Sequence, residues 1–180
     1  MRLADAMRSN AVDLAHVPPA KYDAALLLGP LYHLIEEADR QRAVAESARV
    51  LRPGGLVFAA VITRYAAIRW AAKNDPALVV EDPEGFERIV ASGVNLARPG
   101  GGFTNAHFMH AADLRPLMEQ AGFETLDLIA CEGVVSLIEE RVNALDGDLG
   151  QVWVDLNYRL GKDPAVHAGA EHVLYVGRKP

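Results

Sequence analysis

The residues best placed for chemistry are Gly29, Pro30, Tyr32 and His33, which directly follow the apolar run of residues 22–28. An imidazole can accept a proton from a hydroxyl or an amine near neutral pH, and a phenol can orient such a group. Glycine lets the backbone approach a ligand closely, and proline holds a loop rigid. The simpler interpretation is that Gly-Pro only ends a strand and that His33 caps the helix that follows.

The sequence gives little support to a metal site or to a hydrolase triad. His107 and His110 are three residues apart and could share a helix face, but only Asp113 stands near them as a third ligand, so we expect no metal site. The serines lie outside any G-x-S-x-G elbow, so a hydrolase triad is not expected.

The elements that would position residues 29–33 follow from the apolar pattern. Residues 22–28 are typical of a parallel strand covered on both faces. Residues 34–51 are apolar at helical spacing, and Pro53 with the two glycines after it ends that helix before a second apolar run at residues 56–62. A strand, a helix and a strand in this order form a right-handed crossover with parallel strands. The sequence therefore predicts an α/β fold, in which ligands bind beyond the carboxyl ends of the strands.

The rest of the chain continues the alternation of helices and strands. A long insertion at residues 64–108 contains helical pieces, and a stretch of this length between core elements is usually functional. We expect helices at residues 65–73, 83–92 and 113–122, strands at 123–131 and 172–177, and mostly helix at 132–160.

The composition limits the location and the partners of the protein. At 180 residues with 51% hydrophobic residues, the chain can bury the core of one domain, residues 1–180. The net charge of -6 argues against nucleic acid as a partner. No apolar run reaches the roughly 20 residues that cross a bilayer and no signal peptide is apparent, so we expect a cytoplasmic protein without membrane contact. The single cysteine, Cys131, excludes an intramolecular disulfide, and we expect its thiol to fill space in the core.

Two segments resemble the class I S-adenosylmethionine-dependent methyltransferases. Residues 22–34 are YDAALLLGPLYHL and residues 48–58 are ARVLRPGGLVF, and both motifs and their spacing agree with that family. There, the first segment is the fourth strand with its cofactor-side loop, and the second is the following helix, turn and fifth strand. Residues 103–108, 113–114 and 121–124 also look like later elements of the small-molecule branch. RPGG alone would mark only a turn, so the resemblance depends on the pair.

The resemblance implies a Rossmann-like three-layer αβα fold that binds S-adenosylmethionine as cofactor. Leu28, Gly29 and Pro30 would lie beside the sulfonium, and Asn10 with the backbone amide of Ala11 would contact the adenine. Asparagine stands where aspartate is commoner, but its side-chain carbonyl can still accept a hydrogen bond. A register that uses residues 5 and 6 instead is disfavoured because they lie too far from the following strand.

The resemblance also implies methyl transfer to a small-molecule acceptor. The protein then mainly supplies proximity and orientation, because the methyl carbon is already activated. Tyr32 and His33 are the candidate catalytic residues, although His33 could equally shield the cofactor. The insertion at residues 64–108 would form a lid. Its candidate acceptor contacts are Arg64, Tyr65, Phe103, His107 and Phe108, but aromatic residues in such lids more often fill the lid's own core.

The chain departs from the family before Asn10. Members begin with a strand, a G-x-G-x-G loop that opens a helix and an acidic residue after a second strand, and none of these precedes Asn10. We therefore expect a fold that is incomplete at the N-terminus and binds the cofactor weakly. Residues 100–102, three glycines, cannot replace the loop because no buried strand leads into them, and we expect a mobile hinge there.

The missing first strand is central in this family, so the sheet should have an open edge that invites a partner. The explanations that remain are a truncated gene model, a homodimer that covers the edge, and a decayed paralogue. A non-catalytic α/β interaction module is therefore the alternative to a methyltransferase. A nicotinamide-dependent reductase gains no support, because it needs the same glycine loop.

Overall fold

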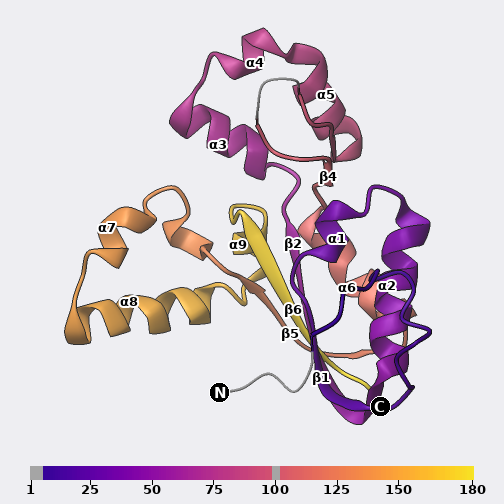
Figure 1. Ribbon diagram of the computed structural model, residues 1–180. Helices are drawn as coiled ribbons and strands as arrows, with labels where there is room; N and C mark the ends of the chain where they lie inside the picture. Colours follow the sequence, from indigo (N-terminus) through magenta and orange to yellow (C-terminus); the bar gives the residue numbers. More distant parts are fainter. Residues whose placement is uncertain (1–5, 99–101) are drawn as a thin grey trace.

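A four-stranded mixed sheet forms the centre of the protein (Figure 1). The computed structural model describes residues 6–98 and 102–180. The strands lie in the order β1 (Tyr22–Leu27), β2 (Leu51–Ile62), β6 (His172–Arg178) and β5 (Glu124–Ala130). β1 and β2 are parallel, whereas β6 runs antiparallel to both of its neighbours. The predicted parallel crossover and the α/β class are confirmed.

Two helices cover one face of this sheet. α2 (Glu37–Val50) and α6 (Ala111–Gln120) pack against the alternate residues of the strands that point toward them. The resulting core includes Val57, Val173 and Tyr175 from the sheet and Val44 and Leu114 from the helices, all of which are fully buried. This layer fixes where β1 ends, and with it the loop that follows.

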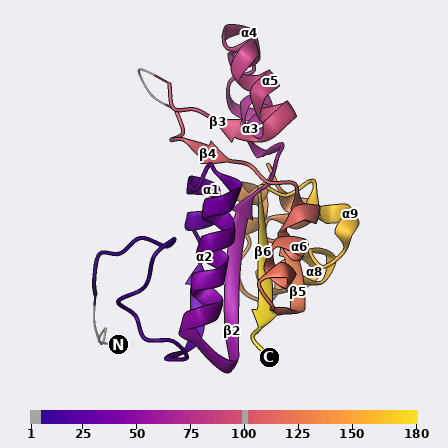
Figure 2. The same ribbon diagram turned by 90° about the vertical axis from the view of Figure 1, so that its right-hand side faces the viewer.

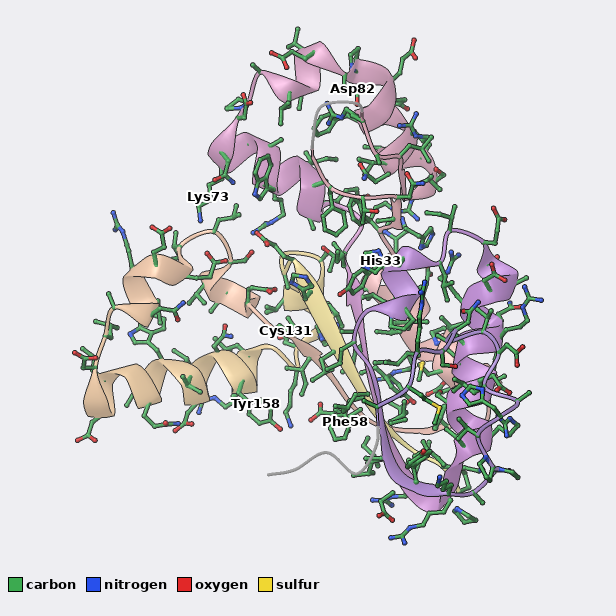
Figure 3. The ribbon with its side chains drawn as sticks, in the orientation of Figure 1. His33, Phe58, Lys73, Asp82, Cys131 and Tyr158 are labelled. Carbon is green, nitrogen blue, oxygen red and sulfur yellow. The ribbon has the colours of Figure 1, made fainter. Side chains whose placement is uncertain are left out.

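The prediction that both faces of the first strand are covered is wrong. Within the described residues β1 is the edge strand of the sheet, and Leu26 is 69% exposed. Leu26, Phe58 and Val176 lie side by side across three strands, on the face that α2 does not cover. Figure 3 shows Phe58 on this side of the sheet. The apolar run of residues 22–28 therefore does not indicate burial on both faces. Burial depends on the neighbouring elements that pack on a strand, and the run itself does not encode them.

β2 begins earlier than the sequence pattern predicted. The strand starts at Leu51, directly after α2, and not at residue 56. The pairing with β1 shifts register between Tyr22 and Ala24, so that Pro53 and Gly54 lie in a bulge, and Gly54 has a φ of +78°. The Lys179 ammonium donates to the carbonyl oxygens of Ala48 and Leu51, at 2.7 Å each, and so satisfies the end of α2.

The lid forms a separate small body at one end of the sheet (Figures 1 and 2). It consists of α3 (Ala66–Asn74), α4 (Leu78–Glu81) and α5 (Pro83–Ser92) with the two-stranded sheet of β3 (Val94–Asn95) and β4 (Ala106–His107). Ile89, Ala106 and Phe108 belong to its core. The chain enters and leaves the lid at one point, where Thr63 and Met109 form a β-bridge.

The remaining elements follow β5 and precede β6 in the sequence. They are η1 (Gly133–Val135), α7 (Glu139–Asn143), α8 (Gly147–Leu160) and α9 (Pro164–His167), which Figure 1 shows on the opposite side of the sheet from α2. None of the residues of α8 is buried. Cys131 is exposed, so the prediction that it fills the core is wrong. The predicted glycine hinge falls mostly outside the described residues, which omit 99–101. None of the described helices is both long and apolar enough to cross a membrane.

Candidate functional site

The loop after β1 leads directly into a short helix, α1 (Pro30–His33). Pro30 occupies the first turn, where a missing N–H costs nothing, and fully buried Leu31 anchors the helix on the core. The Tyr32 hydroxyl donates to the carbonyl oxygen of Leu28 at 2.9 Å and so closes the loop. Gly29 has a φ of -155°, and a Cβ there would lie 3.8 Å from the Tyr32 hydroxyl. Its backbone conformation therefore does not require glycine.

α2 also fixes the N-terminal segment that contains Asn10. The Arg49 guanidinium donates to the carbonyl oxygens of Leu14 at 2.7 Å and Val17 at 2.9 Å. The Glu46 carboxylate accepts the Leu14 N–H at 2.7 Å and also binds Arg49. The hydrogen bonds from Arg49, together with that from Leu14, lower the pKa of Glu46 despite its partial burial. One ion pair on α2 therefore holds this irregular segment next to the sheet.

Asn10 forms a turn of its own. Its side-chain oxygen accepts the Val12 N–H at 3.2 Å, and its backbone oxygen accepts the Asp13 N–H at 3.0 Å. A carbonyl oxygen has two lone pairs, so the side chain can accept a second hydrogen bond.

The two loops meet in one groove of about 650 Å³. This volume lies within the range of small-molecule sites. Its lining residues are Arg8, Ser9, Asn10, Ala11, Pro30, His33 and Leu34. Four of the residues named from the sequence, Asn10, Ala11, Pro30 and His33, therefore share one surface although about twenty residues separate the two segments.

A series of rings connects the groove to the lid. The ring of His33 lies 6.2 Å from that of Phe103 with an angle of 19° between the planes. Phe103 in turn lies 6.1 Å from Phe108, and Tyr32 lies 4.7 Å from His33. Figure 3 shows His33 on the side of α1 that faces the lid. The two candidate catalytic residues and two candidate acceptor contacts thus form one cluster.

The other three residues named for acceptor binding have structural partners. The buried Arg64 guanidinium donates to the carbonyl oxygens of Phe108 at 2.9 Å and Val90 at 3.1 Å. Tyr65 packs edge-on against His110 at 5.8 Å. His107 is 9% exposed, and its Nδ1 is buried without a hydrogen-bond partner among the described residues. Their roles in acceptor binding stay predictions.

Burial and nearby cations make His107 a neutral histidine. Desolvation lowers the pKa of its imidazole to about 4, and the charges of Arg40, Arg64 and His110 add to this effect. The ring is therefore uncharged at neutral pH. No group of three or more potential metal ligands occurs in the ranges 6–98 and 102–180.

A second hollow, which we call the lid cavity, lies between the lid and the ends of β2 and β6. Its volume is about 830 Å³. Apolar and aromatic side chains from α3 and α5 line one part of it, and the polar lining includes Glu81, Arg98, Glu171 and His172. Trp70, Glu171 and His172 were not predicted as site residues, because no motif marks them and the start of a final strand predicts only packing.

The polar end of the lid cavity is built around Glu132. One carboxylate oxygen accepts the His172 Nδ1–H at 2.7 Å, and the other accepts the backbone N–H groups of Glu171 at 3.0 Å and His172 at 2.8 Å. Burial alone would raise the pKa of Glu132, but these hydrogen bonds lower it. The hydrogen bond to Glu132 raises the pKa of His172 against the effect of burial. The pair thus positions two further polar groups, Glu171 and the Nε2 of His172.

Comparison with known proteins identifies the fold. A family model described as a methyltransferase domain matches residues 2–59. An S-adenosylmethionine-dependent methyltransferase from Methanosarcina mazei superposes with a TM-score of 0.59 at 17% identity, over 95% of this chain and 65% of the other. The fold is that of a class I methyltransferase.

Two further solved structures agree with this methyltransferase fold. An S-adenosylmethionine-dependent methyltransferase from Archaeoglobus fulgidus gives a TM-score of 0.52 at 14% identity, over 96% of this chain and 66% of the other. A methyltransferase from Thermotoga maritima gives 0.51 at 17% identity, over 97% and 63%. The chain therefore spans about two thirds or less of these proteins. No curated protein sequence is significantly similar to it.

Proposed function

We propose that this protein binds S-adenosylmethionine in the groove between residues 8–11 and 30–34 and transfers its methyl group to a small-molecule acceptor held beneath the lid. The convergence of these two segments on one groove supports the proposal most directly. The methyltransferase fold adds support, because its ligands lie beyond the carboxyl ends of parallel strands and β1 ends at this groove.

The residues present fit the adenine end of the cofactor and the surroundings of its sulfonium. Asn10 and the Ala11 N–H offer an acceptor and a donor to the adenine edge. Leu28, Gly29 and Pro30 would form the wall beside the sulfonium, which supplies an activated methyl group when bound. The residues described here contain no glycine-rich loop that opens a helix, so we expect weak binding.

Tyr32 and His33 are the proposed catalytic pair. His33 is exposed at the edge of the groove, where its ring can accept a proton from an acceptor hydroxyl or amine. The Tyr32 hydroxyl, already bound to Leu28, can position the acceptor through its lone pairs.

Asn10→Ala is expected to weaken the binding of S-adenosylhomocysteine about fivefold, since one hydrogen bond of roughly 1 kcal/mol is lost. Asn10→Asp should bind at least as well as Asn10→Ala, because it keeps an acceptor for Val12 N–H and for the adenine amino group. Isothermal titration with each variant measures the difference.

The matched control is Asn143→Ala, which removes an exposed asparagine from α7. It should leave the affinity unchanged. If the unsubstituted protein gives no binding heat at millimolar S-adenosylhomocysteine, the methyltransferase proposal fails, and the alternative of a non-catalytic α/β interaction module or decayed paralogue takes its place.

We also propose that the protein forms a homodimer that covers the open edge of the sheet at β1 and the apolar face beside it. Monomeric proteins seldom expose a contiguous apolar patch of large size, and on this face the exposed Leu26 adjoins Phe58 and Val176, which are half-buried. A cytoplasmic location remains our proposal too, and it is supported by the single cysteine.

Leu26→Glu is expected to shift the protein from dimer to monomer, because each copy would bury a carboxylate against the other's apolar surface. Sedimentation velocity measures the two species. Leu149→Glu, at another exposed leucine, on α8, should leave the dimer intact. If the unsubstituted protein is a monomer at every concentration measured, the proposed dimer is wrong.

A further inference from the structure

We propose that the lid cavity is a binding site for an apolar molecule with a primary or secondary amine, whose nitrogen lies toward Glu171 and His172. Insofar as this molecule is the methyl acceptor, the inference rests on the proposed function. The binding site itself does not depend on that function.

The size and the walls of the lid cavity suit a ring-sized apolar group. The volume of about 830 Å³ is typical of small-molecule sites, which are mostly apolar with a few convergent polar groups. Trp70 lines it from α3, Phe86 and Ile89 line it from α5, and Phe103 and Phe108 complete the wall. Trp70 and Phe103 are about half exposed, so their rings are available to a ligand. Aromatic faces also attract cations.

The charges in the lining favour a cation over an anion. The only lining cation in the described ranges with a fixed charge is Arg98, and the Asp82 carboxylate lies 3.2 Å from it. Glu81 and Glu171, by contrast, form no ion pair within the part of the chain that the structure describes. Glu132 already neutralises any charge on His172. An ammonium group would therefore meet two carboxylates, and Arg69, whose charge also acts on Glu171, does not line the lid cavity.

Glu132 makes the polar end rigid, because it binds the side chain of His172 and both backbone N–H groups of the Glu171–His172 pair. In its neutral form, with the Nδ1–H donated to Glu132, His172 presents Nε2 as an acceptor for an amine N–H. Burial and the charges of Glu132 and Glu139 raise the pKa of Glu171, so a bound cation would stabilise its ionised form. A preorganised pair of acceptors is what an amine requires.

The lid cavity and the groove are connected by a ring contact. Phe103 lines the lid cavity and stacks on His33, which lines the groove. Both hollows lie at the same end of the sheet, since His172 pairs with Ile62 at the carboxyl end of β2 and the groove lies at the carboxyl end of β1. An amine bound in the lid cavity therefore lies next to the proposed cofactor site and not on a remote surface.

Tryptophan fluorescence can test this site without any cofactor. The chain has two tryptophans, and Trp153→Phe leaves Trp70, which lines the lid cavity, as the only one. In this background, titration with 2-phenylethylamine should change the emission of Trp70 with a submillimolar Kd. 2-Phenylethanol, a neutral molecule of the same size, should bind more weakly, and phenylacetate should bind most weakly.

Glu171→Gln should weaken 2-phenylethylamine about fivefold, the size of effect expected for a partly exposed ion pair, and leave 2-phenylethanol unchanged. The unchanged alcohol shows that the lid cavity has survived the substitution. Glu87→Gln, on the exposed side of α5, removes an equal charge outside the lid cavity and should change neither ligand.

The site is refuted if 2-phenylethylamine fails to bind, or if 2-phenylethanol or phenylacetate binds as tightly as the amine. It is also refuted if Glu171→Gln does not change the affinity for the amine. These outcomes are separate from those of the cofactor titration. If the amine binds and S-adenosylhomocysteine does not, the lid cavity is supported as a binding site and the methyltransferase proposal fails. If S-adenosylhomocysteine binds and the amine does not, the methyltransferase proposal is supported and the amine site is refuted.

Discussion

Gly93→Ala is expected to destabilise the protein by about 4 kcal/mol, at the upper end of single substitutions. Gly93 ends α5 with a φ of +77°, a conformation that costs an alanine roughly 1–2 kcal/mol. A Cβ there would also lie 2.2 Å from the Phe108 carbonyl oxygen and 2.8 Å from Arg64 Nε. The oxygen belongs to the backbone and is bound by Arg64, so the clash cannot be relieved by a side-chain rotation. Urea unfolding followed by circular dichroism measures the loss.

Gly122→Ala is the matched control for this substitution. Gly122 has a φ of +88°, but a Cβ there would meet no atom within 4 Å. Its cost should therefore be limited to the roughly 1–2 kcal/mol of the left-handed conformation. Equal losses for the two alanines would show that the contact between Gly93 and Phe108 does not constrain the lid.

The free energy of unfolding is expected to fall by about 2 kcal/mol between pH 8 and pH 5 through His107 alone. Its pKa is about 4 in the folded protein and 6.5 in the unfolded chain. Between these values the unfolded chain binds the proton and the folded protein does not, so acid favours unfolding. The loss begins as the pH falls below 6.5, reaches about 3 kcal/mol at pH 4 and is complete only below that pH.

His107→Gln tests this pH dependence, because glutamine does not titrate. The difference in unfolding free energy between the variant and the unsubstituted protein should change by about 2 kcal/mol from pH 8 to pH 5. His172, with its raised pKa, contributes stability below pH 6.5 that is lost as the pH rises, but it does so in both proteins and cancels. His16→Gln, at an exposed site, should show no such change. A constant difference for His107→Gln would contradict a neutral buried imidazole.

Local patterns in the sequence were sufficient to predict the crossover, the lid helices and the loop after β1. The apolar period and the Gly-Pro signal act over a few residues, so they indicate which elements form and in which order. The Pro-Gly-Gly signal misplaced the start of β2, because these residues form a bulge within the strand. The burial of β1 was predicted wrongly. An apolar run indicates a preference for burial, but it does not determine which element, if any, packs against the strand. Cys131 shows the same limit, since a lone cysteine is usually buried but this one is exposed.

The proposed cofactor groove was better predicted than the lid cavity. Asn10 and His33 belong to segments whose spacing resembles a known family, and the structure brings them together. Glu132 and His172, by contrast, are forty residues apart and meet only through the pairing of β5, β6 and the intervening loop. No local pattern encodes such a contact. The partners of Arg49 on residues 14 and 17 were equally invisible, because they are backbone oxygens of an irregular segment.

The entry and the exit of the lid adjoin one another. The Met109 N–H donates to the carbonyl oxygen of Ile62 at 2.9 Å, and the Arg64 N–H donates to the oxygen of Met109 at 2.8 Å. A segment whose two ends meet can be exchanged, lengthened or shortened without moving the strands that it interrupts. Selectivity for the acceptor that we propose beneath the lid can thus diversify by replacement of the whole segment 64–108, while the sheet and the groove at residues 8–34 stay unchanged.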